Sequence, residues 1–182
     1  MIYLRPEFFL LLAASATLRH AAPKRLSWVA LLFSSAFFYF CFHRAGWWIA
    51  LGTATAAYVF SRLLSLGVSA RKKNVLLALS VLSVVLPWLL TKVFLAEVNA
   101  FLAGRHVART LVVPLGVSFY TMQLVAYLAD VRSGKIAAQR NFLKFLLFAT
   151  YFPQMVQGPI PRYAQLAPQL FGKPALDRKS VV

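Results

Sequence analysis

Four apolar runs separated by short basic segments make up the first half of the sequence. They are Phe8–Leu18, Leu26–Phe42, Ala45–Ser61 and Val75–Thr91. An α-helix rises 1.5 Å per residue, so a helix that crosses a bilayer needs about 20 mainly apolar residues, with about 17 as the lower limit. The last three runs meet that limit. The sequence therefore predicts an all-α, polytopic integral membrane protein.

The first run is shorter than the others and leaves two interpretations open. Arg5-Pro6-Glu7 directly precedes it, which favours a helix that begins at the membrane interface. Ala14-Ser15-Ala16 resembles the cleavage site of a secretory signal peptide, but Glu7 interrupts the basic leader that such a peptide needs. Whether residues 8–18 span the membrane therefore stays open.

Composition supports a membrane protein and favours one interpretation of the positive net charge. Hydrophobic residues make up 60% of the chain and charged residues 13%, whereas charged residues make up about 25% of an ordinary soluble domain. Twenty Lys and Arg against four acidic residues give a net charge of +16. Such a balance can indicate nucleic acid, but here the basic residues lie between apolar runs, which is typical of topology signals. We therefore expect membrane lipid and no nucleic acid among the partners.

The distribution of basic residues predicts an orientation. If the runs alternate across the bilayer, segments 19–25, 62–74 and 132–140 share one side and hold ten Lys and Arg. Segments 43–44 and 92–110 lie on the other side and hold four. Cytoplasmic loops carry the excess of positive charge, so we expect the first group to face the cytoplasm.

A predicted helix over residues 111–130 has one polar face. At 100° per residue, Gln123, Tyr127 and Asp130 fall within an arc of about 100°. The opposite arc includes Thr121 and Leu124 and is apolar enough to face lipid. Polar groups at membrane depth normally face protein or a wet cavity. This face is therefore expected either to line a site or to form hydrogen bonds between helices.

Both ends of that helix carry residues with more than one interpretation. Pro114 either begins the helix or kinks it, and Gly116 permits close approach of a neighbouring helix. Asp130 is either part of the polar face or a helix-end residue paired with Arg132 or Lys135.

The next predicted helix is limited by proline. Asn141 is a plausible N-cap for a helix over Phe142–Phe152, after which Pro153 disrupts the hydrogen-bond ladder and Pro159 and Pro161 prevent its recovery. Eleven helical residues reach only ~17 Å, about half the hydrocarbon thickness. The sequence therefore predicts a Pro-broken half-helix.

The residues that follow predict an internal crevice. Irregular backbone at membrane depth is tolerated only when it is buried in protein or lines water, and residues 157–163 hold two prolines. Within this segment Arg162 can hold phosphate or carboxylate through two parallel hydrogen bonds, or it can fix the turn at an interface. Both interpretations stay open.

Two motifs in the segment Leu111–Leu170 point to a family. The first is PLGVSFYTMQ leading to Tyr127 and Asp130, and the second is YFP followed by QGPIPRY. Their order and spacing resemble the bacterial branch of the membrane-bound O-acyltransferases. That branch includes the membrane acyltransferase of alginate acetylation and the membrane component of teichoic acid D-alanylation.

The resemblance implies a function. Such an enzyme moves an acyl group, expected to be acetyl, from a cytoplasmic thioester donor, acetyl-CoA or an acyl carrier, to a hydroxyl of an extracytoplasmic polysaccharide or envelope glycan. It implies a multi-pass location in a bacterial-type cytoplasmic (inner) membrane and an acyltransferase partner outside that membrane. No bound cofactor or metal is expected.

The resemblance also distributes roles over the chain. The family's catalytic histidine lies in a Trp-His motif of the later half, which these 182 residues lack, so this N-terminal part is expected to be inactive alone. Expected substrate or tunnel-lining residues are Gln123, Tyr127, Asp130, Gln157, Arg162 and Tyr163, and expected structural motif residues are Pro114, Gly116, Pro153, Gly158 and Pro159.

Three regions and two alternative functions complete the predictions. Residues 1–110 hold the N-terminal transmembrane helices and an interfacial segment, residues 111–170 the motif region, and residues 171–182 a polar tail that looks truncated. One alternative function is a shortened, non-catalytic membrane module that binds a partner acyltransferase. The other, a transporter, requires a second Pro-broken segment, and the sequence shows none.

Overall fold

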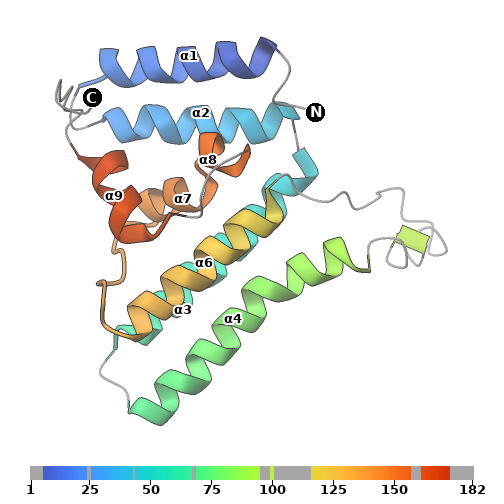
Figure 1. Ribbon diagram of the computed structural model, residues 1–182, viewed down its shortest axis with the longest axis vertical. Coiled ribbons are helices and arrows are strands. Elements are labelled where there is room, and N and C mark those ends of the chain that lie inside the picture. The colour runs from blue at the N-terminus through green and yellow to red at the C-terminus, as the bar shows by residue number, and fades with distance from the viewer. Residues whose placement is uncertain are drawn as a thin grey trace, which may run out of the picture.

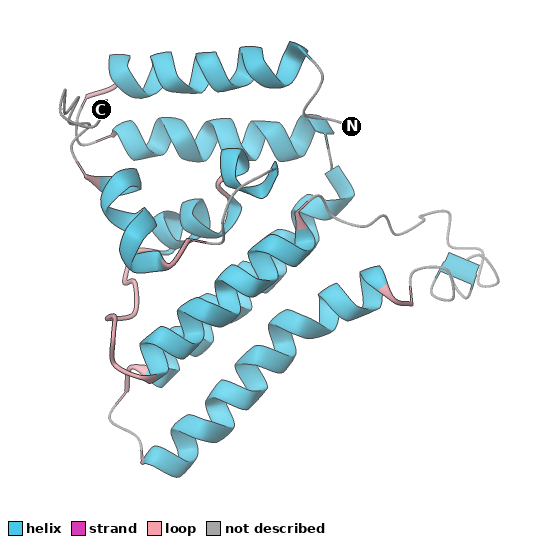
Figure 2. Cartoon of the chain, viewed as in Figure 1, coloured by secondary structure: helices cyan, strands magenta, loops and turns pink. Residues whose placement is uncertain are grey.

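The computed structural model describes residues 6–23, 26–42, 44–66, 69–94, 99–100, 116–156 and 161–172. Figure 2 shows helices joined by loops, and no strand occurs in these ranges. The helices bounded within these ranges are α1 (Pro6–Ala21), α2 (Ser27–Phe42), α3 (Arg44–Leu64), α4 (Ala70–Lys92), α6 (Val117–Arg132), α7 (Phe142–Thr150), α8 (Phe152–Val156) and α9 (Tyr163–Phe171). The all-α prediction is confirmed.

The helices form two packed groups that share α7. Helices α1 and α2 lie side by side, and α3, α4 and α6 pack against one another in an inclined group (Figure 1). The short helix α7 contacts α2, α3, α6 and α9, so it occupies the junction of the two groups. Residues 145–150 are buried there in an unbroken run. Burial on all sides explains why this part of the helix is almost entirely apolar.

The first four helices follow the four apolar runs, but their lengths change the membrane prediction. Only α4, with 23 residues, is long and apolar enough among the described helices to cross a bilayer, a judgement of length and composition alone. Helix α2 has 16 residues, just short of the expected limit. Helix α3 has 21 residues, but its two glycines, two threonines and two arginines lower its hydropathy. The polytopic arrangement is therefore not confirmed by these helices.

An aromatic cluster joins α1, α2 and α8. The Phe38 and Phe152 rings stack with centroids 5.3 Å apart, and Phe8 meets each of them edge-on at 6.0 Å. Such edge-to-face and stacked pairs contribute about 0.5–1.5 kcal/mol each beyond the area that they bury. The cluster holds the chain that leaves α7 against the first two helices.

The predicted half-helix exists, but it ends earlier than expected. Asn141 caps α7, because its Oδ1 accepts the Lys144 N–H at 3.2 Å, as predicted. The helix ends at Thr150 rather than Phe152, since Tyr151 is extended (ψ 106°). Pro153 then lies in the first turn of α8, where the missing N–H needs no partner. Pro153 therefore permits a new short helix after the break at Tyr151.

Gly116 has a conformational role that the sequence did not predict. Its φ of 70° lies in the left-handed region, and it is the N-cap of α6. Glycine adopts this conformation without the Cβ penalty of other residues. The residue therefore sets the turn into α6, and the close approach of a neighbouring helix at Gly116 stays a prediction. Pro114 lies outside the described residues, as do Gln157, Gly158, Pro159 and the tail from residue 173. The three-region division stays a prediction.

Candidate functional site

Helix α6 supplies three of the predicted site residues and is buried on both of its predicted faces. Gln123, Tyr127 and Asp130 are buried, as the polar-face prediction requires. Thr121 and Leu124, expected to face lipid, are buried as well. That part of the prediction is wrong, because α3, α4 and α7 all pack against α6. Helical periodicity identifies faces, but it does not say how many faces are covered.

Gln123 forms a hydrogen bond between helices. Its Nε2 donates to the backbone carbonyl of Phe148 on α7 at 3.0 Å, and the residue is 4% exposed. A buried amide without a partner costs about 1–3 kcal/mol, and this bond avoids that cost for the amide nitrogen. Of the two roles left open for the polar face, the geometry at Gln123 favours helix–helix hydrogen bonding.

Tyr127 and Tyr163, which are 36 positions apart, meet through one glutamine. The Tyr127 hydroxyl accepts the Gln139 backbone N–H at 2.8 Å, and Gln139 Nε2 donates to the Tyr163 hydroxyl at 2.8 Å. The two phenol rings lie with centroids 5.1 Å apart. Gln139 is thus the residue that joins the two motifs of the sequence, and sequence reasoning missed it. Its only local signal is its place two residues before the predicted N-cap Asn141.

Gln139 also organises the start of α7. Its Oε1 accepts the backbone N–H groups of Arg140 at 2.7 Å and Asn141 at 3.2 Å. Every polar atom of this side chain therefore has a partner, which fixes its rotamer. A fixed Gln139 in turn fixes the distance between the two tyrosine hydroxyls.

Apolar rings surround the pair of tyrosines. Phe148 lies edge-on to Tyr163 at 4.9 Å, and Phe145 lies 5.0 Å from Tyr127. Burial raises the pKa of Tyr163 to about 12, with the neighbouring Tyr127 adding to the effect and the Gln139 hydrogen bond opposing it. Its hydroxyl is therefore neutral at physiological pH and able to donate or accept a hydrogen bond. It is not a base.

Asp130 and Arg162 lie together at the edge of this cluster. Arg162 Nη1 is 3.9 Å from Asp130 Oδ1, with side chains 62% and 12% exposed. The alternative pairing of Asp130 with Arg132 or Lys135 does not occur among the ion pairs of the described residues. Arg132 instead donates to Asn74 Oδ1 on α4 from Nε at 3.2 Å and from Nη2 at 2.6 Å. The structure thus brings Asp130, near the C-terminal end of α6, to Arg162, the N-cap residue of α9.

The arrangement is suited to holding an anion and to positioning it. Arg162 offers five N–H donors, its Nη1 lies 3.9 Å from the Asp130 carboxylate in an ion pair, and most of its side chain is exposed. Neutral phenols lie beside it. Among the described residues, no group of three or more His, Cys, Asp and Glu could hold a metal ion. The crevice expected over residues 157–160 lies outside the described residues.

Comparison with known proteins identifies the class of enzyme that this chain resembles. It is 34% identical over 86 residues to the probable alginate O-acetylase AlgI of Pseudomonas fluorescens, which covers 45% of this chain and 17% of that protein. The family resemblance is confirmed. The corresponding protein of Pseudomonas syringae pv. tomato is 39% identical over 56 residues, covering 31% of this chain and 11% of that protein.

A second kind of acetyltransferase is also similar. The peptidoglycan O-acetyltransferase of Helicobacter pylori is 27% identical in a 107-position alignment that covers 46% of this chain and 20% of that protein. The chain thus spans a fifth or less of the length of these relatives. No protein-family model matches the chain, and no solved structure matches it either.

Proposed function

We propose that this chain is part of a membrane-bound O-acyltransferase of a bacterial cytoplasmic membrane. The full enzyme transfers an acetyl group from a cytoplasmic thioester to a hydroxyl of an extracytoplasmic polysaccharide or envelope glycan. The observation that carries the proposal is the similarity to proteins named as O-acetylases of alginate and an O-acetyltransferase of peptidoglycan. The membrane-length helix α4 supports the location.

In the proposed reaction a histidine outside these residues, expected from the resemblance, removes the proton from the acceptor hydroxyl. The oxygen attacks the thioester carbonyl, a carbon–oxygen bond forms and the carbon–sulfur bond breaks. The thiol leaves with the proton, so the reaction needs no oxidant and no further reactant.

The described residues have a supporting role in this proposal. Arg162 binds a phosphate or carboxylate of the donor, and the nearby carboxylate of Asp130 orients the guanidinium of Arg162. Tyr127 and Tyr163 form the wall beside it, held together by Gln139. Gln123 keeps α6 and α7 together and does not contact substrate.

Complementation of a strain that lacks the gene tests the proposal. The full-length gene is restored as wild type, as Arg162→Lys, as Arg162→Gln and as Arg140→Gln, with membrane levels of the protein matched by immunoblot. The readout is the acetate that mild alkali releases from purified envelope polysaccharide. Arg140 is an exposed arginine of the loop before α7 and serves as the charge-matched control.

Wild type and Arg140→Gln are expected to restore ester-linked acetate equally. Arg162→Gln should reduce it at least about tenfold, and Arg162→Lys should retain part of it, because lysine keeps the charge but not the planar pair of donors. Full activity of Arg162→Gln would show that Arg162 does not bind the donor. No polysaccharide-bound acetate with the wild-type gene would contradict the acyltransferase assignment itself and favour the non-catalytic membrane module.

A further inference from the structure

One end of the molecule concentrates basic side chains. The C-terminal ends of α3 and α6 and the N-terminal end of α4 lie together there, at the bottom of Figure 1. Asn74 and Arg132 are hydrogen-bonded across this end, and Tyr58 of α3 donates to the backbone carbonyl of Arg140. We name these side chains the basic end: Arg62, Arg71, Lys72, Lys73, Arg132, Lys135 and Arg140.

Little negative charge balances the basic end. Among the described residues Asp130 is the carboxylate at this end, and it lies beside Arg162. Three of the cations, Arg71, Lys72 and Lys73, occupy the first turn of α4. Cations there oppose the positive end of the helix dipole, and the N-cap Ser69 makes no side-chain hydrogen bond to the free N–H groups. Anions bound at this end would offset both effects.

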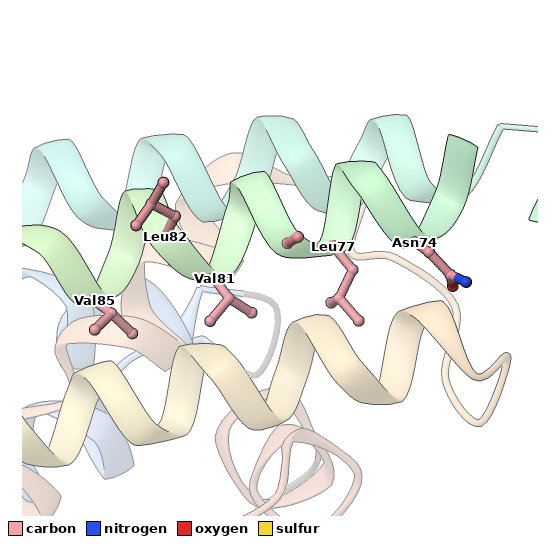
Figure 3. A pocket seen from close by; sticks show the side chains of 6 residues that line it. Asn74, Leu77, Val81, Leu82 and Val85 are labelled. Carbon is pink, nitrogen blue, oxygen red and sulfur yellow. The ribbon is translucent and has the colours of Figure 1, made fainter. Parts of the chain in front are cut away.

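An apolar groove begins at the basic end and runs along α4. It has a volume of about 530 Å³ and is lined by Asn74, Leu77, Ala78, Val81, Leu82 and Val85. Figure 3 shows Asn74, Leu77, Val81 and Val85 projecting from α4 on the side of α6. The eleven-residue rise from Asn74 to Val85 is ~17 Å, close to half of a ~30 Å hydrocarbon core. The groove therefore matches the depth of one leaflet.

Hydrogen bonds between α4 and α6 limit the groove at both ends. At the basic end Arg132 donates to Asn74 at 2.6 Å, and one turn beyond Val85 the Trp88 Nε1 donates to Ser118 Oγ at 3.0 Å. Arg71 lies within about 50° of the centre of the groove face, by the 100° rotation per residue. A guanidinium from each helix thus lies near the Asn74 end of an otherwise apolar groove.

We propose that Arg71, Arg132 and this groove bind an anionic phospholipid. The phosphate headgroup contacts Arg71 and Arg132, and one acyl chain lies along the groove. The charge selects an anionic over a zwitterionic headgroup, and the apolar lining distinguishes a lipid from a soluble phosphate. This site rests on the membrane location in the proposed function, but it is separate from acyl transfer and from Arg162.

Native mass spectrometry of the full chain in a non-denaturing detergent tests the site. Phosphatidylglycerol and phosphatidylcholine with identical acyl chains are titrated separately, and the fractions of lipid-bound protein are compared. The wild-type protein is expected to bind phosphatidylglycerol at least about tenfold more tightly. The double variant Arg71→Gln/Arg132→Gln is expected to bind both lipids equally.

A matched double variant controls for net charge. Lys72→Gln/Lys92→Gln removes the same two charges, but Lys72 points roughly 150° away from the groove and Lys92 lies at the other end of α4. It should keep the preference for phosphatidylglycerol. An equal loss in both double variants would overturn the site in favour of diffuse attraction. Equal binding of the two lipids by the wild-type protein would overturn it as well.

A third variant tests the groove itself. Ala78 lines the groove and is exposed, so Ala78→Phe fills the groove without entering the core. It should weaken binding of both lipids at least about fivefold, and unchanged binding would contradict the acyl-chain position. Glycerol phosphate should not displace the bound lipid. Efficient displacement would mean that the site recognises only the phosphate and not the acyl chain.

The same experiment separates this inference from the proposed function. Binding of neither lipid by the wild-type protein would count against the membrane location as well as the site. Equal binding of both lipids would leave the membrane location intact and remove only the site.

Discussion

Replacement of Gln139 by leucine should weaken the structure more than any ordinary substitution in a loop. This side chain makes three hydrogen bonds, to the Tyr163 hydroxyl and to the backbone N–H groups of Arg140 and Asn141. Each neutral hydrogen bond contributes about 1 kcal/mol net, with a range of about 0.5–1.5. Because Arg140 and Asn141 are exposed, water can replace part of the loss there. We expect Gln139→Leu to lower the free energy of unfolding by about 2–3 kcal/mol.

A second substitution at the same position separates the contribution of the acceptor oxygen of Gln139 from that of its donor amide. Gln139→Glu keeps the oxygen that accepts from Arg140 and Asn141 but replaces the amide that donates to Tyr163. Burial raises the pKa of Tyr163 to about 12, so its hydroxyl keeps its proton at neutral pH and can turn to donate to the new carboxylate. Gln139→Glu should therefore cost less than about 1 kcal/mol at pH 7.

Thermal unfolding of the purified protein in detergent, followed by tryptophan fluorescence, measures these differences. For a chain of this size, 1 kcal/mol corresponds to a shift of about 2–4 °C in the midpoint. Gln139→Leu should thus unfold roughly 4–12 °C lower than the wild type. Gln165→Leu, the same change at an exposed position on α9, is the control and should shift the midpoint by less than about 2 °C.

The comparison of the three variants can refute the reasoning. If Gln139→Leu and Gln165→Leu unfold at the same temperature, the hydrogen bonds of Gln139 do not hold the two motifs together. If Gln139→Glu is as damaging as Gln139→Leu, the acceptor role assigned to Oε1 is wrong. A double-mutant cycle of Gln139→Leu with Tyr163→Phe should give a coupling energy of about 1 kcal/mol.

Three further predictions concern the frame around the site, each measured by the same unfolding assay. Gly116→Ala should cost about 1–2 kcal/mol, because alanine is strained at a φ of 70°, and a change below about 0.5 kcal/mol would contradict the left-handed turn. Asn141→Ala should cost about 1 kcal/mol through loss of the cap to the Lys144 N–H, whereas Asn141→Asp should be neutral. Phe152→Ala should cost about 3–5 kcal/mol, because Phe152 is fully buried between Phe8 and Phe38, and a cost under about 1 kcal/mol would exclude that packing.

Local rules of the sequence accounted for much of the secondary structure. The four apolar runs gave the first four described helices, and Asn141 was correctly identified as the cap of α7. The end of α7 was placed two residues too late, because proline was taken as the point of the break. In the structure the break occurs at Tyr151, and Pro153 is accommodated in the first turn of the next helix.

The candidate site was only partly accessible to the same reasoning. Asp130 and Arg162 were both singled out, but their pairing was not, and Gln139 was not considered. The partners of Asp130 were sought among cations within five positions because a helix brings such residues together. The actual neighbour, Arg162, lies 32 positions further along the chain, and helices α7 and α8 lie between the two residues.

The sequence by itself determined where helices form, where basic residues gather along the chain and which enzymes the chain resembles. These properties depend on local periodicity, on cap and proline chemistry, and on motif order, all of which are written in neighbouring residues. The tertiary structure alone decided that α6 is covered on both faces, that Gln139 joins the two motifs and that Arg162 meets Asp130. Those outcomes depend on how distant segments satisfy each other's buried polar groups and apolar surfaces, and only packing settles that choice.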